Sequence, residues 1–136
     1  MTKLIKTAAA SLVALTIATA GLTVPASAGG SVSFHIAPGN ARDAQALRAG
    51  LQMYSLYNGI KNGGIKQRGS GNVAGLLQNG GGNLGIVHQE GNGHNGTVQQ
   101  NGNRNAYGLF QFGRNTSGHA VQNGNGRTGA TIQFGW

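Results

Sequence analysis

A glutamine recurs every 11 residues through the second half of the chain, and this period is the strongest constraint on the fold. A glycine follows each glutamine two residues later, and the register never slips. The glutamines are Gln67, Gln78, Gln89, Gln100, Gln111, Gln122 and Gln133, and the glycines are Gly69, Gly80, Gly91, Gly102, Gly113, Gly124 and Gly135. A fixed period of this kind indicates a repeat architecture, in which each unit stacks on its neighbours.

Each unit predicts one strand followed by one turn. Residues two apart share a strand face, so the glutamine, its glycine and an aliphatic residue two positions earlier point the same way. Segments rich in Gly and Asn, such as 80–83 and 101–103, supply the positive φ angles of tight turns. Eleven residues cannot hold a strand, a turn and a helix, so two units should close one coil of about 22 residues with a strand on each side.

Three such coils, residues 67–88, 89–110 and 111–132, would stack about 4.8 Å apart. Every glutamine then lies over the glutamine 22 positions away, and stacked carboxamides can donate and accept along the column. Five residues after the glutamine, three units carry an asparagine that should join this ladder: Asn72, Asn83 and Asn105. The sequence therefore predicts a mainly β protein, a two-sheet parallel β-solenoid of about three coils over residues 65–136.

Tyr107 is the one large residue at an inward position that is otherwise small, four residues before each glutamine. It lies between Gly85 and Gly129 in its column, so its ring is expected to cover both glycines. The alternative is that Tyr107 marks a broken coil.

The first 28 residues are typical of a secretory signal peptide. Lys3 and Lys6 precede an apolar run, Ala8–Gly21, and the small residues Ala26–Ala28 form a cleavage site. We therefore expect a secreted mature chain that starts near Gly29. Cys is absent, so disulfides cannot stabilise this exported protein and the repeat itself must do so.

Residues 29–64 predict a strand over 31–36 and one α-helix over 41–57, with Asn40 as the N-cap and a stop at Asn58–Gly59. A solenoid has two end edges that invite further pairing. In one interpretation the helix covers the N-terminal edge, so that growth favours the Trp136 end. In the other, the helix binds a secretion or surface partner and leaves both edges free.

The outward face carries the least repetitive residues. Arg68 and Glu90 are 22 apart and should lie one above the other, as an exposed pair of little energetic weight. Four aromatic residues follow along the same face, and they predict a lateral contact between filaments or with a surface: Phe110, Phe112, Phe134 and Trp136.

The chemistry of an enzyme is missing from the sequence. Asp43 and Glu90 are in different segments, the histidines are dispersed, and His88 with Glu90 reads as solvated surface rather than a metal site. We predict no catalytic, cofactor or metal site. The formal charge of +8, about +6 after signal removal, fits an anionic surface polysaccharide or simple solubility. No basic cluster indicates a specific nucleic acid.

The order of Gln67, Gly69, Asn72 and Ala74 resembles the curlin repeat, and the likeness extends over residues 65–136. Curlins are the subunits of curli, the extracellular functional amyloid fibres of Gram-negative bacteria that serve adhesion and biofilm matrix. The resemblance implies a cell-surface fibre subunit that polymerises by end-to-end stacking. Its implied partners are copies of itself, another curlin subunit and an outer-membrane secretion channel.

The resemblance leaves the role open between a major subunit, which polymerises, and a minor one, which nucleates. Residues 29–64 differ from the Gly- and Asn-rich leader of well-known curlins. The alternative function is a monomeric secreted β-solenoid that binds a surface or a carbohydrate.

Overall fold

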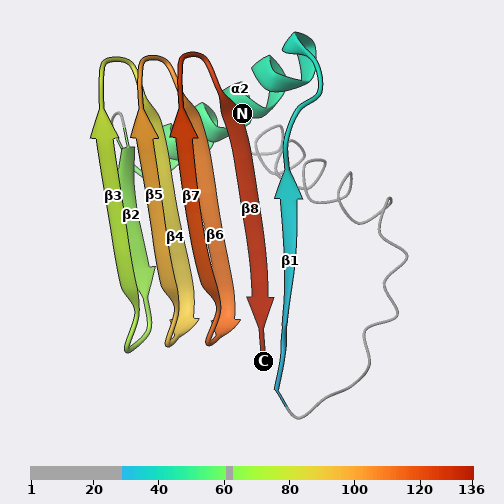
Figure 1. Cartoon of the computed structure of the whole chain (residues 1–136). Helices are drawn as coiled ribbons and strands as arrows, with labels where there is room; N and C mark the ends of the chain where they lie inside the picture. Colours follow the sequence, from blue (N-terminus) through green and yellow to red (C-terminus); the bar gives the residue numbers. More distant parts are fainter. Residues whose placement is uncertain (1–28, 61–62) are drawn as a thin grey trace.

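The computed structural model describes residues 29–60 and 63–136 (Figure 1). The predicted signal peptide lies outside them. The described residues form one helix and eight strands: β1 (Ser31–Ile36), α2 (Ala41–Tyr57), β2 (Gly63–Arg68), β3 (Val73–Asn79), β4 (Leu84–Asn92), β5 (Asn95–Asn101), β6 (Ala106–Arg114), β7 (Ser117–Asn123) and β8 (Thr128–Gly135).

From β2 onward the strands alternate between two parallel sheets that face each other (Figure 1). The larger sheet has the order β8-β6-β4-β2, and the smaller has the order β3-β5-β7. Parallel neighbours pair with a 22-residue offset, as Gln67 with Gln89 and Gln78 with Gln100 show. The predicted parallel β-solenoid of about three 22-residue coils is therefore confirmed, including the strand and helix that precede it.

Strand β1 extends the larger sheet beyond β8 in the antiparallel direction, with Ser31 opposite Gly135 and Ile36 opposite Ala130. Its bounds match the strand expected from the sequence. The pairing places the first described strand beside the last one (Figure 1). One edge at the Trp136 end of the solenoid is thus covered.

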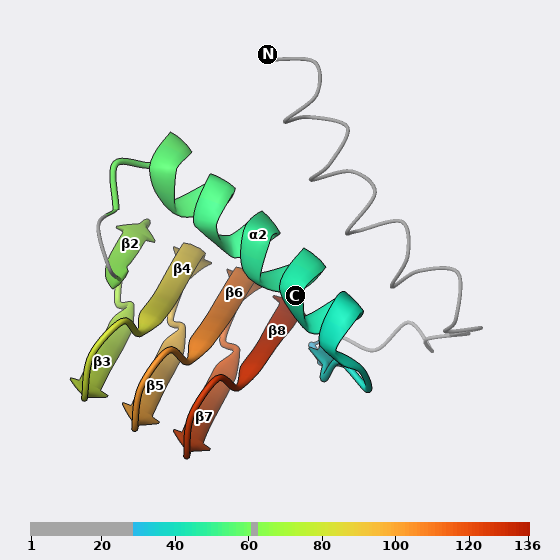
Figure 2. The ribbon, with the colours of Figure 1, turned by 90° about the horizontal axis from the view of Figure 1, so that it is seen from above.

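Helix α2 starts after Asn40, whose side-chain Oδ1 accepts a hydrogen bond from the Asp43 N–H at 2.9 Å. Seen from above, the helix lies across the outer face of the larger sheet and away from the smaller one (Figure 2). Leu47 and Leu51 are buried there against outward-facing Ile86 and Ala130. The helix therefore covers a sheet face rather than a coil end.

Both expectations about the end edges need correction. The helix does not cover the N-terminal edge, because an apolar strip on the larger sheet gives its Leu side chains a place to bury. Gly108 keeps this strip shallow, since a Cβ there would lie 2.7 Å from Leu51 Cδ2. The edges are not both free either, because β1 occupies β8.

Between the two sheets, aliphatic residues alternate with the glutamines. Val87, Val98 and Leu109 are each no more than 1% exposed. Tyr107 is buried within an unbroken strand β6, so the broken-coil alternative is wrong. Its ring lies closest to Gly129, where an added Cβ would meet Tyr107 Cε2 at 2.9 Å, whereas the atoms nearest to a Cβ on Gly85 belong to Leu76, Gln100 and Gln78.

The Tyr107 hydroxyl explains this one-sided placement. It lies 2.6 Å from Thr131 Oγ1 and 3.3 Å from His35 Nδ1, on the β8 side. A buried hydroxyl must find a hydrogen-bond partner, and Thr131 supplies one in the direction of Gly129.

No helix in residues 29–60 or 63–136 is long and apolar enough to span a membrane.

Truncating Leu51 tests how the helix is held. Leu51→Ala should lower the free energy of unfolding by about 2–5 kcal/mol, because a fully buried side chain is lost and a cavity remains. Leu56→Ala is the matched control on the same helix, since Leu56 is 78% exposed and its loss should change stability by less than about 0.5 kcal/mol. Denaturant titration measures both, and equal effects would contradict the packing described.

Candidate functional site

Two unbroken columns of hydrogen-bonded glutamine carboxamides run along the interior of the solenoid. In the larger sheet, Nε2 of each glutamine donates to Oε1 of the glutamine 22 residues later, at 2.7–2.8 Å. In the smaller sheet the same bonds measure 2.9 Å. The donors always point toward the C-terminal end, so each column has a direction. Its two ends are chemically different.

Most of these glutamines also bridge the two sheets. The Nε2 of Gln89 donates to the Val73 carbonyl at 2.8 Å, and the Nε2 of Gln100 donates to the Leu84 carbonyl at 3.0 Å. Gln111, Gln122 and Gln133 make the same bond to a strand start 16 residues earlier. A carboxamide has two N–H groups, so one serves the column and the other serves the opposite sheet.

Burial makes these bonds matter. Gln89, Gln100 and Gln111 are fully buried, where an unpaired amide would be costly. Among the described residues, every buried side-chain nitrogen and oxygen has a hydrogen-bond partner. The polar core is therefore fully satisfied, and it specifies a register that apolar side chains alone would leave loose.

The three predicted ladder asparagines are stacked in a different way from the glutamines. Asn83 Nδ2 donates to the Gly102 carbonyl at 2.9 Å, and Asn83 Oδ1 accepts from the Asn105 N–H at 2.9 Å. Asn72 and Asn105 make equivalent bonds. These side chains clamp the backbone of the next coil, because turns present backbone N–H and C=O groups that a strand ladder does not use.

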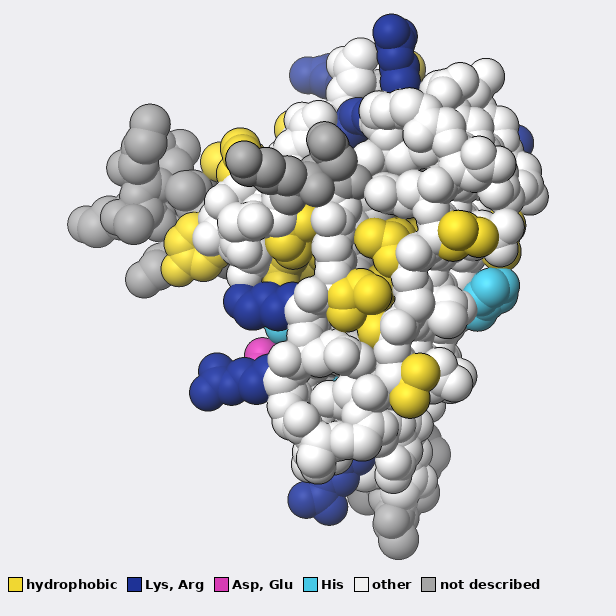
Figure 3. All heavy atoms as spheres, turned by 90° about the vertical axis from the view of Figure 1, so that its left-hand side faces the viewer, with side chains coloured by type: hydrophobic (Ala, Val, Ile, Leu, Met, Phe, Trp, Pro, Cys, Tyr) yellow, Lys and Arg dark blue, Asp and Glu magenta, His cyan; other side chains and the backbone are white. Residues whose placement is uncertain are grey.

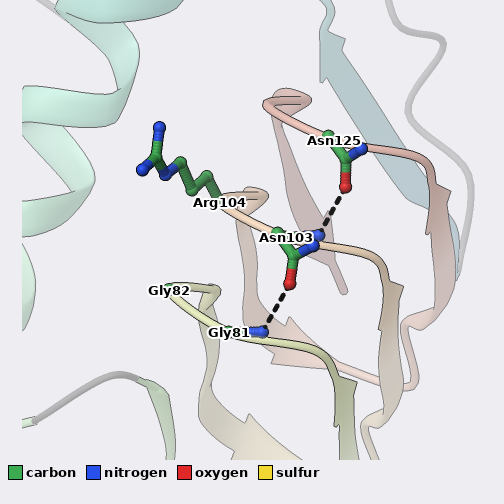
Figure 4. Close-up of a pocket in the computed structure, with 5 residues that line it drawn as sticks. All are labelled: Gly81, Gly82, Asn103, Arg104 and Asn125. Atoms are coloured by element: carbon green, nitrogen blue, oxygen red, sulfur yellow. Dashed lines mark hydrogen bonds between the residues drawn. The ribbon is translucent and has the colours of Figure 1, made fainter.

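A second set of turn asparagines was not singled out from the sequence. Asn103 Oδ1 accepts from the Gly81 N–H, and Asn125 Oδ1 accepts from the Asn103 N–H, each at 2.8 Å (Figure 4). Asn92 does the same for Ser70. The signal was present, since each follows a repeat glutamine by three residues, but the pattern holds in only some units. A hollow at these turns is lined by Gly81, Asn103 and Asn125, which bond one another, together with Gly82 and Arg104.

The repeat glycines permit the coils to approach closely. A Cβ on Gly91 would lie 1.9 Å from the Gly113 carbonyl oxygen, and a Cβ on Gly80 would lie 2.0 Å from that of Gly102. Six of the seven predicted turn glycines have positive φ. Gly135 is not among them, but it is equally crowded, with its Cβ position 1.8 Å from the Arg114 oxygen.

The start of the solenoid is an open end. Within the described chain, β2 and β3 each have a strand neighbour on one side only. Apolar side chains gather at the centre of this end, with Lys and Arg toward its margins (Figure 3). Ile65 is 44% exposed, whereas Val87 and Leu109, which follow it in its column, are each no more than 1% exposed. Such a surface is suited to pairing with another coil.

The outer face of the larger sheet is partly used by the helix. The ring of Phe110 packs edge-on against Tyr54 at 5.2 Å, so it contributes less to any lateral contact than the sequence indicated. Phe112 stacks on Phe134 at 5.4 Å, and Phe134 and Trp136 remain 40% and 45% exposed. The lateral contact stays a prediction, now resting on three residues. Arg68 and Glu90 form the expected exposed pair at 4.0 Å.

His88 is the only titratable group in this face with a lowered pKa among those described. Burial disfavours its charged form, Lys66 adds to the effect, and Glu90 opposes it. Its Nδ1 contacts the Tyr54 hydroxyl. Burial, with Glu90 second, raises the pKa of Tyr54 to about 12. Both groups are therefore neutral at pH 7, and their contact ties the helix to the sheet.

The described residues hold no group of three His, Cys, Asp or Glu side chains that could bind a metal ion. Comparison of the chain with protein-family models, with curated proteins and with solved structures finds no match. The functional reading therefore rests on the repeat and its geometry.

Replacing Gln111 tests the column. Gln111→Leu removes three bonds, from the Gln89 donor, to the Gln133 acceptor and to the Asn95 carbonyl, and it should cost about 1–3 kcal/mol for each buried group left without a partner. Gln99→Leu is the matched control, because Gln99 lies on the outer face of the smaller sheet and makes only a 3.4 Å bond to Asn101. Denaturant titration measures the free energy of unfolding of both variants, and equal decreases would contradict a stabilising role of the glutamine column.

Acid should weaken the protein through His88. Its folded-state pKa lies below the ordinary 6.5, so the unfolded chain binds a proton that the folded chain refuses. Stability contributed by neutral His88 is present above pH 6.5 and falls as the pH drops toward the folded pKa. The unfolding midpoint of His88→Gln should lose less between pH 7 and pH 5 than that of the parent chain, and parallel pH profiles would contradict this.

Proposed function

We propose that the chain is a structural subunit of an extracellular curli-like amyloid fibre. The observation that carries this is the pair of in-register glutamine columns, whose 22-residue repeat reaches an open coil edge at β2 and β3. A column that pairs each coil with the next can pair one molecule with the next by the same bonds. Parallel, in-register stacking with amide ladders is the arrangement of cross-β fibres.

The proposed fibre grows by end-to-end stacking of coils from successive copies, and its biological roles are adhesion and biofilm matrix. Its class of partner is first a copy of itself, then another curlin subunit and an outer-membrane secretion channel. A role as a minor, nucleating subunit is the variant of this proposal that fits a solenoid of only about three coils. The excess positive charge supports contact with anionic surface polysaccharide.

One observation favours a second function. Strand β1 covers the edge of β8, as monomeric β proteins commonly do with edges they do not want paired. A secreted monomeric β-solenoid that binds a surface or a carbohydrate would be built this way. The outer columns of the smaller sheet are mixed, for example Leu77, Gln99 and Val121, and offer no regular array to such a ligand.

Incubation of the purified chain starting at Gly29 tests the proposal. It should form thioflavin-positive fibres with a meridional reflection near 4.8 Å. Gln111→Leu should slow assembly much more than Gln99→Leu, because only the first interrupts a column. If the purified chain stays monomeric at high concentration, the proposed fibre function is wrong and the surface-binding module is favoured.

A further inference from the structure

The two ends of the solenoid are unequal. At the start, β2 and β3 are both open in the described chain. At the far end, β1 covers β8, while no strand of residues 29–60 or 63–136 lies beyond β7. A second copy stacking there in the solenoid register meets one free edge and one occupied edge. Fibre growth at this end therefore depends on what β1 does.

Strand β1 is held chiefly by its backbone pairing with β8 and by Ile36, which packs against the buried cluster under the helix. None of its six residues is buried, and Ser31, Ser33 and His35 are exposed. Gln133 reaches the Ser33 hydroxyl at 3.4 Å, a longer bond than the 2.7–2.8 Å bonds inside the same column. The firmer side-chain contacts are those of His35 with Thr131 and of the Phe34 ring with Phe134. Elements with few buried contacts open most readily.

A groove of about 540 Å³ lies beside β1, over the free edge of β7. Val121 and Gln122 of β7 line it together with His35 and Tyr107. Gln122 accepts from Gln100 and donates to the Ala106 carbonyl, and no glutamine lies ahead of it in the described column. The connection from β1 to α2, residues 37–41 and Ala44, forms the other wall of the groove, which reaches the β7 edge beside the buried Gln122.

The start of a second copy matches this edge residue for residue. β3 lies 44 residues before β7, in the same phase of the repeat, so it can meet β7 as it meets β5. Leu76 would then lie over Ala120, continuing the aliphatic core, and Gln122 would face Gln78. This contact would bury Ala74 and Leu76, which face the core at the start of the solenoid and are only partly buried there.

We propose that β1 is a displaceable cap on fibre growth. A second copy docks β3 on the free β7 edge first, and its β2 then replaces β1 on β8. This inference rests on the proposed fibre function, and it adds the order of the two pairing steps in fibre growth.

The exchange gives up the contacts of His35 with Thr131 and of Phe34 with Phe134, and it completes the core column. The long Gln133 to Ser33 bond gives way to a glutamine column bond from Gln133 to the second copy's Gln67, of the kind seen throughout the column. In the solenoid register Arg68 of the second copy lies over Phe134, where a guanidinium can stack on the ring. Docking of β3 holds the second copy's β2 close to β8 of the first copy, so the replacement of β1 by β2 becomes effectively intramolecular.

A disulfide that fixes β1 tests the cap. Phe34 and Ile132 are opposite each other in the β1–β8 pair, and antiparallel partners are close enough for a disulfide. The chain has no native Cys, so Phe34→Cys with Ile132→Cys gives a single defined bridge. Oxidised, the variant should elongate fibres at least about tenfold more slowly than the same protein after reduction. Added to growing parental fibres, the oxidised form should also join an end and stop it.

Equal elongation rates for the oxidised and reduced forms would overturn the cap and leave the fibre function standing. If the parental chain forms no fibres either, the proposed function fails and the cap fails with it. Phe34→Ser provides an independent check that needs no disulfide. It removes the ring contact with Phe134 and should shorten the lag before assembly, whereas an unchanged or longer lag would contradict a displaceable β1.

Discussion

Hydrogen bonding between buried glutamine carboxamides is the interaction on which the rest of the structure depends. The chain has 26 glycines, which have no side chain to bury and lose the most conformational freedom on folding, so hydrophobic burial has a large entropy of ordering to offset. The carboxamides supply bonds along each column, and most also bond across to the facing sheet. They fix register and sheet spacing together, and the aliphatic residues fill the space that remains.

Directionality follows from the same bonds. Every column donor points toward the C-terminal end, so a stack of molecules would be polar and its two ends would present different groups. The turns reinforce this order, because asparagine side chains bind the backbone of the neighbouring coil. Self-assembly then needs no new chemistry at the interface. What it needs is an unoccupied edge, and this is why the position of β1 matters more than its small size indicates.

The repeat region was largely predictable because its information is local and redundant. The period of Gln67 through Gln133 fixes strand positions, the inward face and the pairing offset at once. The asparagine clamps were predicted less well, since a side chain that bonds to backbone leaves a weaker sequence pattern than one that bonds to its own kind. The one-sided placement of Tyr107 was missed for a similar reason, because it depends on Thr131 from another coil.

The sequence by itself determined the solenoid, its coil length, its glutamine columns and the bounds of the strand and helix that precede it. Only the tertiary structure decided where that strand and helix lie. Their amphipathic patterns state which faces are apolar but not which partner buries them. Helix α2 lies on the outer face because Ile86, Gly108 and Ala130 leave a shallow apolar strip there. Strand β1 pairs with β8, the last strand of the larger sheet, whose outer edge the repeat leaves without a partner. Both placements depend on contacts between residues that are far apart in the sequence, and a local repeat pattern does not predict such contacts.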